Sequence, residues 1–325
     1  MEFNLRSKGG KIVKRGISHI ALVFLMVIAV FMGCGSIDET SDETPGNTSP
    51  WVKEEGKRVD EPYFFDVCVV QLGDGRYRMY GELHGDIISY LSGDGLSWKR
   101  EEGKRMENAG FPFVMELPDG RWRMYYSAMG IGAEDRFLSA ISTDGLTFEV
   151  EEGHRYDGKS DYEQIVQSPR IVKLDDGTYR MYFTAISDVG TENETARILS
   201  AISSDGLNFT LEEGVRIDPT VPPLVGKRAA HAWPITLSDG SICLYFAGAT
   251  TNGGGIISAI SSDGLNFTIN PFPELLNWAE DKDVQDPCVI AIGDTLRMYY
   301  GLYNGPYVIP ESGIYSALNT SVISQ

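Results

Sequence analysis

The sequence predicts an all-β protein, a five-bladed β-propeller with four-stranded antiparallel blades. A strand motif, Arg-Met-Tyr or its variant Cys-Leu-Tyr followed by one more aromatic or glycine residue, occurs five times, at 78–81, 123–126, 180–183, 243–246 and 297–300. A turn motif, Ser-x-Asp-Gly-Leu followed by an aromatic residue two positions later, occurs four times, at 92–98, 142–148, 203–209 and 261–267. Repeats of this length with several short strands each are typical of blades that must stack to bury their faces.

Residues 175–218 contain the clearest copy of the repeat. An Asp-Gly turn at 176–177 precedes an apolar run at 179–185, and a second Asp-Gly turn follows the apolar run at 198–203. Asp-Gly pairs between alternating apolar runs are a strong hairpin signal. With the preceding run at 166–174, this copy gives four antiparallel strands. We expect the aspartate in the second turn of each copy to have a structural role: Asp94, Asp144, Asp205 and Asp263.

The ends of the repeat array predict how the ring closes. The fifth copy stops at 313–318 without a fourth strand, whereas 51–58 (WVKEEGKR) matches 209–216 (FTLEEGVR) at the same spacing. An N-terminal strand would therefore complete the last blade, which removes the exposed sheet edges of an open array. We accordingly assign 51–325 to one propeller domain.

The residues before the propeller predict export. Residues 1–33 contain a basic segment followed by an apolar run, the order of a signal peptide. Cys34 follows a small residue, as in lipoproteins that are acylated on this cysteine; an uncleaved anchor and an ordinary signal are the alternatives. Residues 34–50 are acidic and rich in Ser and Thr, which predicts a flexible spacer. We expect an extracytoplasmic lipoprotein that contacts the membrane only through this anchor.

Charge limits the classes of partner. The formal net charge is −18, and residues 1–33 carry five basic residues and one acidic residue, so removing them leaves about −22. Such a surface repels nucleic acids and anionic lipid headgroups. It suits a neutral or cationic ligand, or it simply keeps an exported protein soluble. We expect a monomer that binds carbohydrate and no nucleic acid.

Four cysteines occur, at positions 34, 68, 243 and 288, and their spacing excludes a structural zinc motif. Cys68 and Cys288 occupy the same position in the first strands of copies one and five, which are neighbours in a closed ring. A disulfide between them and two buried thiols are both compatible with the sequence.

The first strand of each blade is expected to line the central channel. Aligning the copies back from their first Asp-Gly turns, with copy five and its slightly shorter turn anchored on Asp286-Pro287, brings five residues to one strand-start position: Asp66, Phe111, Ser168, His231 and Asp286. Two carboxylates and an imidazole in one cavity can perform general acid–base chemistry. Asp66 and Asp286 come from adjacent blades, and like charges in close reach raise one pKa, as glycoside hydrolysis requires.

Other residues near these strand starts are candidates for substrate binding. Arg170 follows Ser168 on a channel strand, where it would bind an anionic group or sugar hydroxyls, or pair with Asp66 or Asp286. Five aromatic residues would stack on sugar faces or pack in the blade core: Tyr63, Phe64, Phe111, Phe113 and Trp233. The predicted substrate-binding set is His231, Arg170, Ser168, Phe111, Trp233 and Arg228.

Five blades, the isolated Asp66, Gln285-Asp286-Pro287 and Ala232-Trp233-Pro234 resemble the arabinanase, β-xylosidase, levansucrase and invertase superfamily of glycosidases. The resemblance covers about 51–318. It implies three acids on different blades acting as base, pKa modulator and acid, with Asp66 at the base position. No cofactor or metal is predicted from the residues, and a channel calcium near His231 follows by analogy only.

The chain departs from that superfamily in copies two to four, whose strand starts carry Phe111, Ser168 and His231. Glu163, in the loop before Ser168, is therefore the candidate proton donor, with an exposed loop carboxylate as the alternative. Three functions remain open: an enzyme that processes a neutral glycan, a glycan-binding propeller without activity, and a structural or adhesion protein. The Asp66, His231 and Asp286 set favours the enzyme, and a product from a glycan would separate it from a binding protein.

Overall fold

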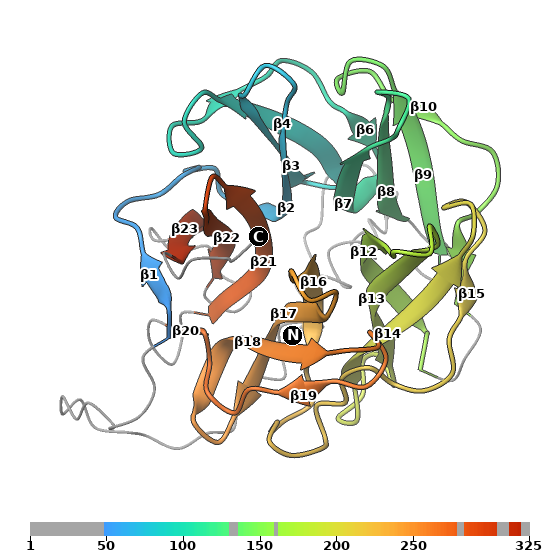
Figure 1. Ribbon diagram of the computed structural model, residues 1–325, viewed down its shortest axis with the longest axis vertical. Coiled ribbons are helices and arrows are strands. Elements are labelled where there is room, and N and C mark those ends of the chain that lie inside the picture. Colours follow the sequence, from blue (N-terminus) through green and yellow to red (C-terminus); the bar gives the residue numbers. More distant parts are fainter. Residues whose placement is uncertain (1–48, 130–135, 159–161, 278–282, 304–311, 320–325) are drawn as a thin grey trace, which may run out of the picture.

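The computed structural model describes residues 49–129, 136–158, 162–277, 283–303 and 312–319 (Figure 1). The predicted signal, Cys34 and the spacer up to residue 48 lie outside them. Within the described residues every regular element is a strand, and no helix there is long and apolar enough to span a membrane. Five antiparallel sheets form a ring, which confirms the predicted five-bladed propeller.

The strands follow the blades in chain order. Blade 1 consists of β2 (Phe64–Gln71), β3 (Tyr77–Leu83), β4 (Asp86–Ser92) and β5 (Lys99–Arg100), with β6 (Met106–Glu107) beside β4. Blade 2 consists of β7 (Ala109–Glu116), β8 (Trp122–Ala128), β9 (Arg136–Ser142) and β10 (Glu149–Val150), with β11 (Tyr156–Asp157) beside β9. Blade 3 consists of β12 (Ile165–Lys173), β13 (Tyr179–Ser187), β14 (Thr195–Ser203) and β15 (Thr210–Leu211).

Blade 4 consists of β16 (Ala230–Thr236), β17 (Ile242–Thr250), β18 (Gly253–Ser261) and β19 (Thr268–Ile269), with β20 (Leu275–Leu276) beside β18. Blade 5 consists of β21 (Asp283–Ile292), β22 (Thr295–Tyr303), β23 (Gly313–Asn319) and the N-terminal β1 (Trp51–Lys53). The two faces of each second strand pack against the neighbouring blades. The motif methionine is therefore fully buried in the four blades that have one: Met79, Met124, Met181 and Met298.

Blade 5 closes the ring as predicted, because β1 pairs antiparallel with β23 and places Trp51 opposite Asn319 (Figure 1). The Glu54 carboxylate accepts hydrogen bonds from Nε and Nη2 of Arg297 (2.9 and 3.1 Å) and from Oγ of Ser316 (2.7 Å). The same arginine–glutamate clasp ties the second strand to the tail after the fourth strand in three other blades: Arg78–Glu101, Arg123–Glu151 and Arg180–Glu212.

Neighbouring blades are joined through the Asp-Gly turns. At four junctions a tyrosine of the second strand donates a hydrogen bond of 2.7–2.8 Å to the turn glycine carbonyl of the next blade: Tyr80 to Gly145, Tyr125 to Gly206, Tyr182 to Gly264 and Tyr299 to Gly95. The turn itself is held by its aspartate; Oδ1 of Asp205 accepts from the backbone N–H groups of Leu207 and Asn208. The structural role predicted for these aspartates is thereby confirmed.

The five first strands contact one another around the centre in the order β2, β7, β12, β16, β21 (Figure 1). Each carries a β-bulge in which two residues oppose one residue of the second strand. The first bulge residue has a left-handed φ of 50–57° in every blade: Asp66, Phe111, Ser168, His231 and Asp286. The structural equivalence that the sequence alignment predicted therefore holds in all five blades.

Candidate functional site

The bulges bring four side chains to one point at the end of the channel where the first strands begin, which we call the channel mouth. Nδ1 of His231 lies 2.8 Å from Oδ1 of Asp66, 3.1 Å from Oδ1 of Asp286 and 2.9 Å from Oγ of Ser168. All four residues are buried, and the aspartates are each 5% exposed. Asp66 and Asp286 lie 165 and 55 positions away from His231 in the sequence. They nevertheless share one site with it, as the sequence predicted.

Arg228 fixes the proton on the His231 ring. Its Nη2 lies 3.0 Å from Nε2 of His231. Because a guanidinium only donates hydrogen bonds, Nε2 must accept, and we assign the ring proton to Nδ1. The backbone N–H of His231 also donates to Oγ1 of Thr184 (2.9 Å), which holds the bulge itself. A neutral imidazole therefore directs one N–H at the cluster of carboxylates.

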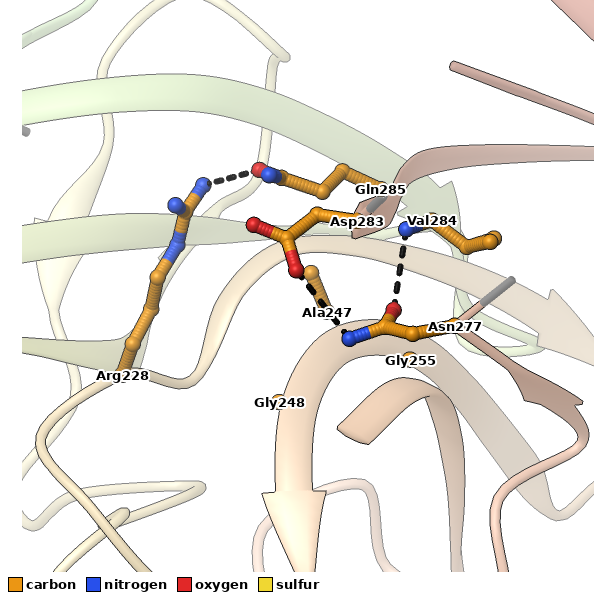
Figure 2. Close-up of a pocket in the computed structure, with 8 residues that line it drawn as sticks. All are labelled: Arg228, Ala247, Gly248, Gly255, Asn277, Asp283, Val284 and Gln285. Carbon is orange, nitrogen blue, oxygen red and sulfur yellow. Dashed lines mark hydrogen bonds between the residues drawn. The ribbon is translucent and has the colours of Figure 1, made fainter. Parts of the chain in front are cut away.

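Figure 2 shows Arg228 reaching from blade 4 to Gln285 of β21, whose side-chain oxygen accepts a second bond from Nη2 (2.6 Å). A pocket of about 10 Å³ lies between them and Asn277, roughly the space of one water molecule. Asn277 is held by Asp283 (3.1 Å) and by the backbone N–H of Val284 (2.9 Å). Arg228 is thus positioned by blade 5 while it contacts the histidine of blade 4.

The surroundings of Asp286 favour its protonated form. Burial, followed by the negative charge of Asp66, raises the pKa of Asp286, and His231 and Arg228 only partly oppose this effect. The Tyr303 hydroxyl lies close to Asp286; burial and then the charges of Asp286 and Asp66 raise the pKa of Tyr303 well above its usual value. Gly301 permits this approach, because a Cβ there would meet the Tyr303 oxygen at 1.9 Å. Asp286 therefore holds a proton more readily than an aspartate in water.

A third buried carboxyl, Glu82, was missed by the sequence reasoning. It is 1% exposed, and burial, followed by the charges of Asp66 and Asp286, raises its pKa well above the usual value. Its carboxyl lies against Gly110, where a Cβ would approach Oε2 to 2.3 Å. A signal existed in the repeat, since the residue after the strand motif is uncharged in the other copies: Ser127, Thr184, Ala247 and Gly301.

Arg170 and Trp233 lie two residues after the bulge, deeper in the channel. Arg170 is 2% exposed, donates from Nη1 to the carbonyls of Phe111 (3.3 Å) and Pro169 (3.0 Å), and places its guanidinium 5.3 Å from the Trp233 ring. Trp233 donates to the Val289 carbonyl (2.9 Å). Arg170 thus takes neither of the aspartates as its hydrogen-bond acceptor, and both residues form the floor of the site.

Phe111 and Glu163 differ in their relation to the cluster. The Phe111 ring is half-buried and lies 6.0 Å from the His231 ring, so it flanks the site directly. Glu163 is buried rather than exposed and accepts a hydrogen bond from the hydroxyl of Tyr156. The Tyr156 ring packs on Phe183 at the junction of blades 2 and 3. The role of Glu163 as a proton donor stays a prediction.

The cysteines of blades 1 and 5 are buried free thiols, not a disulfide. Cys68 accepts a hydrogen bond from the backbone N–H of Val114, and Cys288 accepts one from Val69, both at 3.2 Å. Each thiol therefore joins its own first strand to the next one along the ring. Of the two arrangements compatible with the sequence, the structure contains the two thiols.

The calcium implied by the resemblance does not fit this cluster. The donor atoms of Asp66, His231 and Asp286 all lie within 4.8 Å of one another. A cation among them would need the lone pair of Nδ1, but that nitrogen carries the ring proton while Arg228 bonds Nε2. Calcium also prefers a shell of about six to eight oxygen ligands. The chemistry available here belongs to protein acids and bases.

The five-bladed fold is shared with solved structures that are described as glycoside hydrolases. No protein-family model and no curated protein sequence matches the chain. Its fold is similar to that of a thermostable family-43 glycoside hydrolase (TM-score 0.64, 15% identity, covering 81% of this chain and 95% of the other). An endo-arabinase from Bacteroides thetaiotaomicron is also similar (TM-score 0.59, 15% identity, covering 78% and 92%).

A third similar structure is described with the GH130 mannoside phosphorylases, as a family that contains glycoside hydrolases targeting β-1,2 mannosidic linkages in Candida mannan. Its TM-score is 0.61 at 16% identity, covering 82% of this chain and 93% of the other. At such identities the likeness establishes the propeller fold, and the activity of this chain must be argued from its own residues.

Proposed function

We propose that the protein is a glycoside hydrolase that cleaves a neutral oligo- or polysaccharide at the channel mouth. One observation carries the proposal: Asp66 and Asp286, from adjacent blades, both approach the single Nδ1–H of His231. Two buried carboxylates this close resist simultaneous ionisation, so the pair holds a proton donor beside an acceptor. Because the titrations are coupled, the two pKa values belong to the pair.

The roles follow from the contacts. Asp66 accepts the hydrogen bond from Nδ1 of His231 (2.8 Å), and we assign to it the role of base or nucleophile. Asp286, whose pKa burial and the Asp66 charge raise, donates its proton to the glycosidic oxygen as the C–O bond breaks. Asp66 either takes a proton from the water that attacks the anomeric carbon or attacks that carbon itself, and inversion or retention of the product anomer distinguishes these two routes.

The test begins with aryl glycosides and a panel of plant and microbial polysaccharides. Asp66→Asn and Asp286→Asn should each lower turnover by at least about a hundredfold, the lower range for a positioned acid or base. Asp205→Asn, in a turn between outer strands, is the matched control and should keep the activity per folded molecule. Full activity in both channel variants would contradict the proposal, and Glu82→Gln and Glu163→Gln measured in parallel would identify another donor.

A glycan-binding propeller without activity is the second candidate, because the strand starts of blades 2 to 4 carry Phe111, Ser168 and His231 instead of acids. If the protein only binds glycans, members of the same panel of glycosides and polysaccharides should bind to it without forming a hydrolysis product. Asp66→Asn would then weaken binding while no reducing sugar appears with the wild-type protein.

We also propose that the protein is exported and tethered through a lipid on Cys34, which leaves the propeller outside the cytoplasm to meet polysaccharide. The support is the order of basic, apolar and small residues before that cysteine. Labelling of growing cells with a fatty acid should mark the wild-type protein and spare Cys34→Ala. Equal label in the two proteins would refute the lipid tether.

A further inference from the structure

Four rings form a continuous row along the channel mouth, on blades 1 and 5. The Tyr303 ring lies 4.9 Å from Phe65, Phe65 lies 6.3 Å from Tyr63, and Tyr63 lies 5.3 Å from His84. We call these four residues the aromatic row. All of them lie at the same end of the channel, because β2 begins there while β3 and β22 end there.

The inner end of the row reaches the proposed catalytic pair. Phe65 directly precedes Asp66 and pairs across the strands with Glu82. Tyr303 lies close enough to Asp286 for each group to shift the pKa of the other. A ligand whose reacting bond lies between the two aspartates would therefore extend along the row without leaving contact with the protein.

The outer end of the row is open to solvent, and the backbone of Tyr63 there has an unfavourable conformation. Tyr63 is 46% exposed, so its ring is not required to fill the core. Its φ is 64°, a left-handed value that disfavours a bulky residue by about 1–2 kcal/mol. An exposed aromatic ring held in a strained backbone beside a buried cluster of acids is typical of a functional position.

We propose that the aromatic row is a subsite for a second sugar ring of a neutral glycan, adjacent to the ring that is cleaved. The apolar C–H face of a pyranose packs on flat rings, and the polar edges of Tyr63 and His84 can hydrogen-bond its hydroxyls. The strongly acidic protein surface disfavours an anionic sugar at the same place. This inference rests on the proposed function in one respect: the cleavage of the adjacent sugar ring. Binding of a sugar ring to the aromatic row does not require that cleavage.

Two variants of Tyr63 separate binding from stability. Tyr63→Gly removes the ring and relieves the left-handed backbone, so its melting temperature should equal or exceed that of the wild-type protein. Tyr63→Phe keeps the ring and should bind within about twofold of wild type. The expected loss for Tyr63→Gly is roughly fivefold to tenfold in Kd or KM for an oligosaccharide.

Calorimetric titration with oligosaccharides of two to six units provides a readout that needs no turnover. If the wild-type protein binds but forms no product, and Tyr63→Gly weakens that binding, the subsite stands while the hydrolase proposal fails. If turnover occurs and Tyr63→Gly handles oligosaccharides like the wild-type protein, the subsite is refuted and the hydrolase proposal stands. Absence of wild-type binding to every glycan in the panel would also overturn the subsite.

Discussion

Replacing Glu54 by alanine should weaken the seam of the ring. The change removes three hydrogen bonds to one carboxylate and leaves the Arg297 side chain, which is 9% exposed, without its counter-ion. Loss of one partner of a buried ion pair costs about 3–5 kcal/mol. Because the Glu54 side chain is 20% exposed and water can enter, we expect a smaller loss of about 2–3 kcal/mol.

That loss corresponds to a fall in melting temperature of about 4–12 °C for a domain of this size. Differential scanning calorimetry of Glu54→Ala measures it, and Glu212→Ala is the matched control, since the blade 3 clasp has nearly the same bond lengths. Of these two glutamates, only Glu54 follows a strand, β1, that is distant in sequence from the rest of its blade and pairs with β23 through three residues. Hydrogen exchange of β1 and β23 should therefore rise in Glu54→Ala and remain low in Glu212→Ala. A melting temperature within about 1 °C of wild type for Glu54→Ala would refute the closure argument.

Three further outcomes are expected. Glu82→Gln and Asp286→Asn should flatten the fall of the melting temperature as pH rises above about 4. Burial raises both carboxyl pKa values in the folded state, so the stability that the protonated forms contribute is lost as pH rises through those raised values. Asp205→Asn should lower the melting temperature and leave turnover unchanged. Burial acts to raise the pKa of Asp205, but the hydrogen bonds that its carboxylate accepts outweigh burial and lower this pKa, so the stability it contributes is lost as pH falls through the lowered pKa. Burial raises the pKa of Cys68 to about 11 and that of Cys288 well above its usual value, so these thiols should react with a chromogenic disulfide at pH 8 only after denaturation.

The repeats made the fold and the strand-start position predictable. The Asp-Gly turns set the register of the first four blades, so counting back from them places Asp66, Ser168 and His231 at the same bulge, and the Asp-Pro pair at 286–287 adds blade 5. Closure was predictable too, because the glutamate that contacts Arg297 belongs to a sequence tail found in other blades.

Residues whose positions depend on contacts between blades were harder to find. Glu82 belongs to a second strand, and it reaches the site only because Gly110 of blade 2 leaves room for its carboxyl. Likewise, the proton position on His231 depends on Arg228, whose side chain is held by a glutamine of another blade. Such placements follow from side-chain packing across the ring, which a motif alignment does not encode.

The left-handed bulges have a consequence for how the chemistry of such a ring can change. Five positions share one backbone conformation while carrying a carboxylate, a phenyl ring, a hydroxyl, an imidazole and a second carboxylate. Since each blade holds its bulge through strand pairing, the identity of the side chain can vary without remodelling the scaffold. An evolving lineage can therefore acquire a new reaction one blade at a time, and a designer can install a third acid at Phe111 or Ser168 by a single codon replacement.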